Sequence, residues 1–227
     1  MQDWLNHPAV QSGLAPFVAA LVIAELLQRV RLSGLALLAG FILTVYLASD
    51  FTLFPLTAAR KIIWATIAAG ALGLLASLLH GSHWRPVLAA LAAATVVWVE
   101  WGILQNKPVS TALQWAAGSA LFVGWLVFWL DGMQFSPVQT GSTGVALGFG
   151  TGGAALFGGS ALLGQFGLAL GAASGAYLLI QMISNRPLPC GRSYTLPLGL
   201  TSGLCGCIAT LTTQLPWYAL APLSLIP

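Results

Sequence analysis

Charged side chains are scarce in this sequence. Only 6% of the 227 residues are Asp, Glu, Lys or Arg, against about 25% in an ordinary soluble domain. Eight basic and five acidic residues cannot cover the surface of a water-soluble protein of this size. The net charge of +3 is too small, and the basic residues too dispersed, to indicate nucleic-acid binding. The solvent for most of the surface must therefore be hydrocarbon.

Cysteine and histidine are also few. The three cysteines, Cys190, Cys205 and Cys207, are odd in number and clustered late, which excludes a disulfide framework. His80 and His83 bracket a turn with H-x-x-H spacing, but a closed zinc site takes four ligands. Cys205 and Cys207 lie two residues apart on a helix and point to different faces. We therefore expect no metal site.

No acid follows Asp131 in the chain. The segment Gly148–Gly153 matches G-x-G-x-x-G, but a dinucleotide fold also needs a preceding strand and a later acid. A serine nucleophile at Ser160 has no histidine on a following span to act as its base. We expect no catalytic residue and no cofactor.

The first residues, Met1 to Gly13, contain no Lys or Arg, whereas a secretory signal needs a basic start. We therefore expect the apolar stretch from Leu14 onward to stay in the membrane as the first span.

Long apolar runs make up most of the remaining sequence. A membrane-spanning helix needs about 20 apolar residues, with a range of about 17–25. The predicted spans are 14–28, 32–49, 62–79, 86–104, 112–130, 138–157, 161–183 and 194–215. We predict a single all-α domain, a polytopic membrane protein of about eight transmembrane helices (seven or eight), with no soluble domain.

One uncharged stretch, Gly132 to Asn185, is too long for a single span. Its 54 residues would form a helix about 80 Å long, far beyond a hydrocarbon core of about 30 Å. The chain must therefore fold back, and Gly158-Gly159-Ser160 is the natural place for a tight reversal.

The distribution of Lys and Arg predicts the orientation in the membrane. One side collects Arg29, Arg31, Arg85, Arg186 and Arg192, and the other collects Arg60, Lys61 and Lys107. The positive-inside rule makes the first side cytoplasmic, with both termini on the other side of a bacterial inner membrane. Seven tryptophans lie within one or two turns of a predicted span end, as interfacial tryptophans do: Trp64, Trp84, Trp98, Trp101, Trp115, Trp129 and Trp217.

Glycines recur at every fourth residue in the sixth and seventh spans. The two triplets are Gly144, Gly148 and Gly152, and Gly167, Gly171 and Gly175. Each triplet leaves a smooth groove on one helix face, so that another backbone can approach closely. These faces could pack on each other or on a neighbouring helix, or one could bind another subunit or a lipid chain.

Two acids lie inside predicted spans, where acids are costly and often functional. Glu25 is four residues before Arg29, a spacing that allows an ion pair on one helix face. Glu100 lies between Trp98 and Trp101, about one turn from a span end. We expect interfacial or structural roles for both acids, with a proton or ion relay as the alternative.

Three functions fit this sequence. The first is a non-catalytic subunit or assembly factor, whose partners are the lipid bilayer and other membrane proteins. The second is a small transporter or channel for a neutral or lipid-like solute, using polar residues on the last three spans: Thr143, Thr151, Gln165, Ser174, Gln181, Thr201, Ser202, Thr210 and Thr212. The third is a membrane-embedded lipid-modifying enzyme, whose candidate residues would gather on the cytoplasmic side, although the positive-inside rule explains the same cluster equally well: Arg29, Arg31, His80, His83, Arg85, Asp131, Arg186 and Arg192. A lipid-facing Gly-rich face would favour the first, and a cavity that reaches mid-membrane among spans six to eight would favour the second. Convergence of His80, His83 and Asp131 within hydrogen-bond reach would favour the third.

Overall fold

The computed structural model of the chain describes residues 7–28, 32–49, 54–78, 83–183, 189–213 and 215–227. Within these residues every regular element is a helix, and no strand is present. In chain order the elements are η1 (Val10–Leu14), α2 (Ala15–Gln28), α3 (Leu35–Ser49), α4 (Ala58–Leu78), α5 (Trp84–Leu104), α6 (Val109–Gly132), α7 (Pro137–Phe157), α8 (Ala161–Ile183), α9 (Arg192–Thr212), η2 (Trp217–Ala219) and η3 (Pro222–Leu225). The predicted all-helical fold is confirmed.

Six helical segments of the described chain are long and apolar enough to cross a membrane. They are Val10–Leu27, Ala58–Leu78, Trp84–Leu104, Val109–Gly132, Ala161–Ile183 and Arg192–Thr212. The protein is therefore an integral, multi-pass membrane protein. The count of six is below the expected eight, because α3 has only 15 residues and α7 is rich in glycine and threonine.

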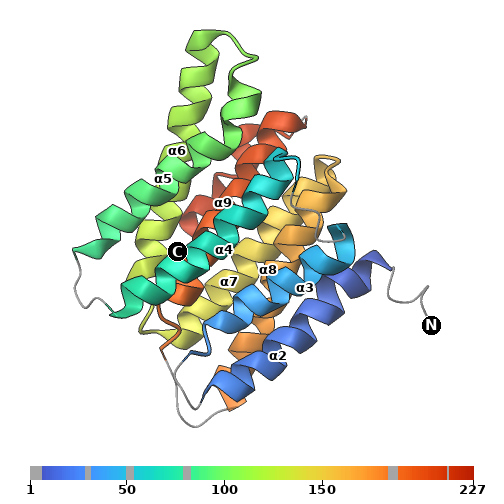
Figure 1. The fold of residues 1–227 in the computed structure, drawn as a ribbon, viewed down its shortest axis with the longest axis vertical. Helices are drawn as coiled ribbons and strands as arrows, with labels where there is room; N and C mark the ends of the chain where they lie inside the picture. The colour runs from blue at the N-terminus through green and yellow to red at the C-terminus, as the bar shows by residue number, and fades with distance from the viewer. Residues whose placement is uncertain (1–6, 29–31, 50–53, 79–82, 184–188, 214) are drawn as a thin grey trace.

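The helix α9 lies at the centre of the molecule. It packs against α3, α4, α5, α6, α7 and α8, and Figure 1 shows it between the α5–α6 pair on one side and the α2–α3 pair on the other. Of its apolar segment 94% of the residues are buried, against 33% to 67% for the other five segments. It is also the least apolar of the six, so its polar groups are shielded from lipid by its neighbours.

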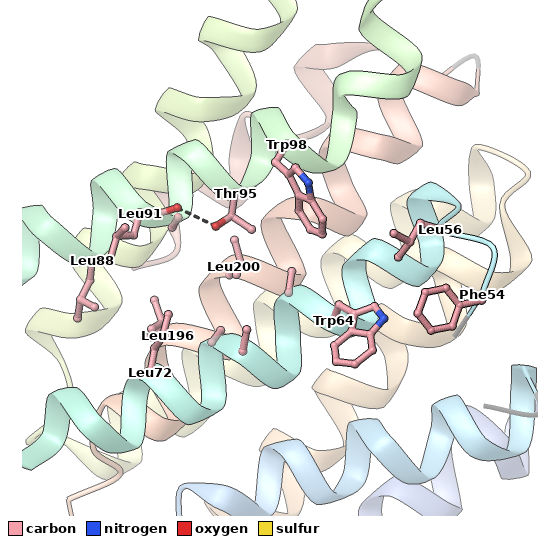
Figure 2. A pocket seen from close by; sticks show the side chains of 14 residues that line it. Phe54, Leu56, Trp64, Leu72, Leu88, Leu91, Thr95, Trp98, Leu196 and Leu200 are labelled. Atoms are coloured by element: carbon pink, nitrogen blue, oxygen red, sulfur yellow. Dashed lines mark hydrogen bonds between the residues drawn. The ribbon is translucent and has the colours of Figure 1, made fainter. Parts of the chain in front are cut away.

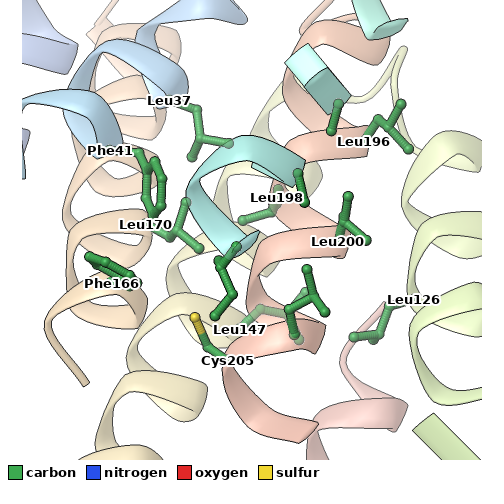
Figure 3. Packing of buried hydrophobic residues seen from close by; sticks show 14 of the residues in the cluster. Leu37, Phe41, Leu126, Leu147, Phe166, Leu170, Leu196, Leu198, Leu200 and Cys205 are labelled. Carbon is green, nitrogen blue, oxygen red and sulfur yellow. The ribbon is translucent and has the colours of Figure 1, made fainter. Parts of the chain in front are cut away.

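Apolar side chains from several helices meet around α9. Figure 3 shows Leu198 and Leu200 of α9 among Leu126, Leu147 and Leu170 of the surrounding helices. A polar contact also crosses this core. Thr66 of α4 and Thr201 of α9 share a buried hydrogen bond of 2.7 Å between their hydroxyl oxygens. This contact ties α4 to the central helix.

The hairpin of α7 and α8 has the most extensive interhelical contact in the fold. The chain reverses at Gly158, Gly159 and Ser160, between the end of α7 and the start of α8. Gly159 has a φ of +88°, a left-handed conformation that glycine adopts at little cost. The reversal therefore lies where the glycine pair predicts it.

A buried ion pair joins the ends of four helices, and we call it the clasp. Arg192 of α9 donates from Nε to Oδ1 of Asp131 on α6 at 2.9 Å, and from Nη1 to the carbonyl oxygen of Ala76 on α4 at 2.8 Å. Arg85 of α5 lies 3.5 Å from the other carboxylate oxygen. Because Asp131 and Arg192 are 2% and 4% exposed, both charges depend on each other for neutralisation.

The C-terminal segment folds back along the helix bundle. Its short helices η2 and η3 lie against each other, and η3 contacts α6 and α7. The indole N–H of Trp125, about two thirds of the way along α6, donates to the carbonyl oxygen of Ser224 at 3.0 Å. Irregular backbone at membrane depth needs such partners, because lipid offers none.

Candidate functional site

An apolar groove runs between α4 and α5, with α9 as its floor, and has a cavity volume of about 530 Å³. Figure 2 shows its side chains facing the space between the two helices. We call it the α4–α5 groove. It is lined by Phe54, Leu56, Trp64, Ala65, Ala68, Ala69, Leu72, Leu88, Leu91, Ala92, Thr95, Trp98, Leu196 and Leu200. Its volume falls within the range of about 300–1,000 Å³ that is typical of small-molecule sites.

The groove offers a ligand almost no polar group along its length. The hydroxyl of Thr95 is already occupied, because it donates to the carbonyl oxygen of Leu91 at 2.8 Å. From Trp64 to Leu72 the α4 wall rises eight residues, or about 12 Å at 1.5 Å per residue. The arrangement suits an extended apolar chain and carries no group for chemistry.

A cation marks one end of the groove. Lys61 of α4 donates from Nζ to the carbonyl oxygen of Trp98 at 3.1 Å, and the same atom lies 5.1 Å from the centre of the Trp98 ring. No carboxylate lies within ion-pair distance of Lys61 among the described residues. Its charge is therefore available to an anionic group at the mouth of the groove.

The glycines of the sixth and seventh predicted spans lie mainly between α7 and α8. A Cβ at Gly148 would lie only 2.2 Å from the backbone nitrogen of Gly171, and one at Gly167 would lie 2.5 Å from the Cα of Gly152. A Cβ at Gly144 would meet the hydroxyl oxygens of Ser174 and Tyr194. Gly175 has more room, since its nearest neighbours are Val145 and Phe17 at 3.8 and 4.0 Å.

The two candidate acids have opposite environments. Glu25 is exposed on α2, and its expected partner Arg29 is outside the described residues. Glu100 is 0% exposed on α5, and neither of its carboxylate oxygens accepts a hydrogen bond. The two acids are not brought together.

The residues considered for an enzyme do not form one site in the described part of the chain. Asp131 pairs with Arg85 and Arg192, His83 is exposed, and His80 lies outside the described residues. No group of three or more His, Cys, Asp or Glu side chains lies together in the described ranges. Cys190 is buried at 2% exposure, and this burial raises the pKa of its thiol to about 12.

Sequence reasoning missed the groove, and it grouped the residues of the clasp on one side of the membrane without pairing them. The groove depends on how far α4 and α5 diverge over α9, which no local pattern encodes. The clasp joins Asp131 to a residue 61 positions later. Its only signal was that one acid and several arginines fall at span ends on the same predicted side.

Comparison of the chain with protein-family models, with curated proteins and with solved structures finds no match in any of the three.

Proposed function

We propose that this protein binds a lipid or lipid-like molecule in the α4–α5 groove, a different place from the polar residues of the last three spans that the transporter hypothesis invoked. The observation that carries the proposal is the combination of a long apolar groove with an uncompensated cation, Lys61, at one end. The occupant we infer is an anionic phospholipid. One acyl chain lies over α9, and the phosphate lies near Lys61.

A Gly-rich face open to another subunit was one of the features that favoured the subunit hypothesis. Gly148, Gly152, Gly167 and Gly171 pack within the α7–α8 hairpin, so these four glycines do not provide such a face. A non-catalytic subunit stays a prediction, and the experiment below also tests it.

The finer topology belongs to the same proposal. We propose that α2 to α9 all cross the membrane, with α3 and α7 shielded by longer neighbours. The end that carries the clasp would face the cytoplasm of a bacterium, and both termini would lie on the other side of the inner membrane. Arg85 and Arg192 at the clasp support this orientation.

Native mass spectrometry in mild detergent tests the lipid proposal, with phosphatidylglycerol as the anionic lipid and phosphatidylcholine as the zwitterionic one. We expect one phosphatidylglycerol to remain bound in preference to phosphatidylcholine. Ala68→Phe should reduce bound lipid severalfold, because Ala68 lines the groove. The matched control is Ala71→Phe, which changes an exposed alanine of the same helix outside the groove and should leave lipid binding unchanged.

A second pair of variants tests the contribution of the lipid head group separately from that of the acyl chain. Lys61→Gln should lower the preference for phosphatidylglycerol up to about fivefold, since an exposed ion pair contributes up to about 1 kcal/mol. Lys107→Gln is its control, because Lys107 also lies over a tryptophan ring, that of Trp115, away from the groove. Equal lipid retention in Ala68→Phe and Ala71→Phe would contradict the proposal. A stoichiometric second polypeptide from the native host would favour the subunit hypothesis.

A further inference from the structure

The carboxyl group of Glu100 is the one buried acid without a strong partner in the described chain. It is 0% exposed, neither oxygen accepts a hydrogen bond, and no described Lys or Arg lies within ion-pair distance. Asp131, the other buried acid, is neutralised by Arg192. An isolated carboxylate in such surroundings costs several kcal/mol even after relaxation. Glu100 must therefore hold a neutralising ligand.

The described helices that pack against α5 are α4, α6 and α9. On α6 the Ser119 hydroxyl lies close to the carboxyl group without meeting hydrogen-bond geometry, and on α9 the Cys207 thiol is near enough to interact with it electrostatically. From α4 the nearest charge is Lys61, whose ammonium group lies on the carbonyl oxygen of Trp98 instead. One hydroxyl and one thiol are too few ligands for a metal cation, which takes six or more oxygens in protein sites of the calcium or magnesium type. A proton needs no such set of ligands, so it is the neutralising group that fits this site.

A crevice lies on the far side of Ser119 and Cys207. It has a volume of about 260 Å³ between α6, the end of α9 and the C-terminal segment, and we call it the tail crevice. It is lined by Trp115, Gly118, Ser119, Phe122, Cys207, Thr210, Trp217, Leu220, Ala221 and Ser224. Ser119 and Cys207 thus belong both to the crevice wall and to the surroundings of Glu100. Water in the crevice would therefore lie against two neighbours of the acid.

The side-chain direction also favours this route. Helical side chains tilt toward the N-terminus of their helix, so the carboxyl group of Glu100 lies deeper in the bundle than its Cα. That tilt moves the group away from the end of α5 at Leu104 and toward the level of Ser119. A hydroxyl can accept one proton while it donates another, so Ser119 is suited to pass a proton between water and a carboxylate.

We propose that Glu100 is a proton-binding site inside the membrane, neutral in the resting protein, and that it exchanges its proton with water in the tail crevice through Ser119. The inference is independent of the lipid proposal, because it involves the opposite face of α5 and none of the residues that line the α4–α5 groove. Protonatable acids in this setting are the elements from which proton relays in membrane proteins are built.

Infrared spectroscopy of the intact protein in lipid bilayers at pH 7.5 tests the proposal. A protonated carboxyl group has a carbonyl band that is distinct from the bands of a carboxylate. We expect this band in the native protein, and we expect Glu100→Gln to lack it. On transfer to heavy water the band should shift within minutes, because the proton exchanges through the crevice. Absence of the band, or a band that stays unshifted for hours, would overturn the proposal.

Two glycine variants test the route. A Cβ at Gly118 or at Gly102 would meet nothing within 4 Å, so both positions accept a side chain. Gly118→Leu extends into the tail crevice and should slow the heavy-water shift at least severalfold, whereas Gly102→Leu, which lies outside it, should not. Equal exchange rates in the two variants would refute the route through the crevice.

A lipid-soluble carbodiimide gives a second readout that does not depend on a variant folding. Carbodiimides add to protonated carboxyl groups, and a solvated glutamate with its ordinary pKa of about 4.3 is almost fully ionised at pH 7.5. We expect mass spectrometry to find Glu100 modified in the folded protein at this pH and unmodified once the protein is unfolded in detergent. Modification that is equal in the two states would contradict a neutral Glu100.

Discussion

Replacing Arg192 by methionine should destabilise the fold more than any other single change of a basic side chain described here. The substitution removes the 2.9 Å bond to Asp131 and the 2.8 Å bond to the carbonyl oxygen of Ala76. Asp131 is 2% exposed and would keep only Arg85, at 3.5 Å. Removing one partner of a buried ion pair costs about 3–5 kcal/mol, because the remaining charge stays buried.

The double variant distinguishes the pair from simple loss of packing. Asp131→Leu with Arg192→Met removes both charges together, and replacing a buried pair by apolar residues of similar volume is often neutral or stabilising. We expect the double variant to recover at least about 2 kcal/mol relative to the sum of the single variants. Arg85→Met is the control. The Arg85 side chain is 35% exposed, and partly exposed pairs contribute about 0–1 kcal/mol.

The free energy of unfolding can be measured by titrating the micelle-bound protein with a denaturing detergent and following tryptophan fluorescence. The chain has nine tryptophans to report on unfolding. The reasoning is refuted if Arg192→Met costs less than about 1 kcal/mol or no more than Arg85→Met. Strict additivity in the double variant would also refute it, because the two charges would then not depend on each other.

Two further predictions concern the hairpin and the thiols. Gly148→Ala should lower the stability by about 1–3 kcal/mol, because its Cβ would lie 2.2 Å from the backbone nitrogen of Gly171. The control is Gly153→Ala, whose Cβ meets nothing within 4 Å and which should change the unfolding midpoint little or raise it. Equal losses of stability in the two variants would contradict the close approach of α7 and α8. Cys190 should resist maleimide at pH 7–8 and react after denaturation, because burial raises its thiol pKa to about 12 and leaves almost no thiolate at the pH of the assay. Rapid labelling of folded protein, followed by peptide mass spectrometry, would disprove its burial.

Local signals in the sequence predicted much of the fold. The glycine pair at 158 and 159 indicated the reversal between α7 and α8, because a backbone with positive φ favours glycine. Some boundaries differ. The helix α4 begins at Ala58 instead of residue 62, because a helix can include Arg60 and Lys61 in its first turn while their long side chains reach the interface. The number of spans, six or eight, depends on whether α3 and α7 are included. The helix α3 is short for a span, and α7 is rich in glycine and threonine.

The candidate sites were less accessible to sequence reasoning. The position of Glu100 between two tryptophans predicted that it lies near a helix end. It gave no information on which helices cover the side chain of Glu100. The surroundings of Glu100 include Ser119 of the next helix, α6, but also Cys207 of α9, which lies more than 100 residues later in the chain. Lys61 likewise becomes the end of a groove only because Trp98 of α5 lies beside it.

The sequence by itself determined that this chain is helical and lies in a membrane. Too few charges are present to cover a soluble surface, and in lipid each apolar run satisfies its backbone hydrogen bonds as a helix. The tertiary structure alone decided that α9 is central, that Asp131 meets Arg192, and that α4 and α5 leave a groove. The physical reason is that lipid is as apolar as the helix surfaces, so hydrophobicity cannot select which helices pair. Close packing and a few long-range polar contacts make that choice.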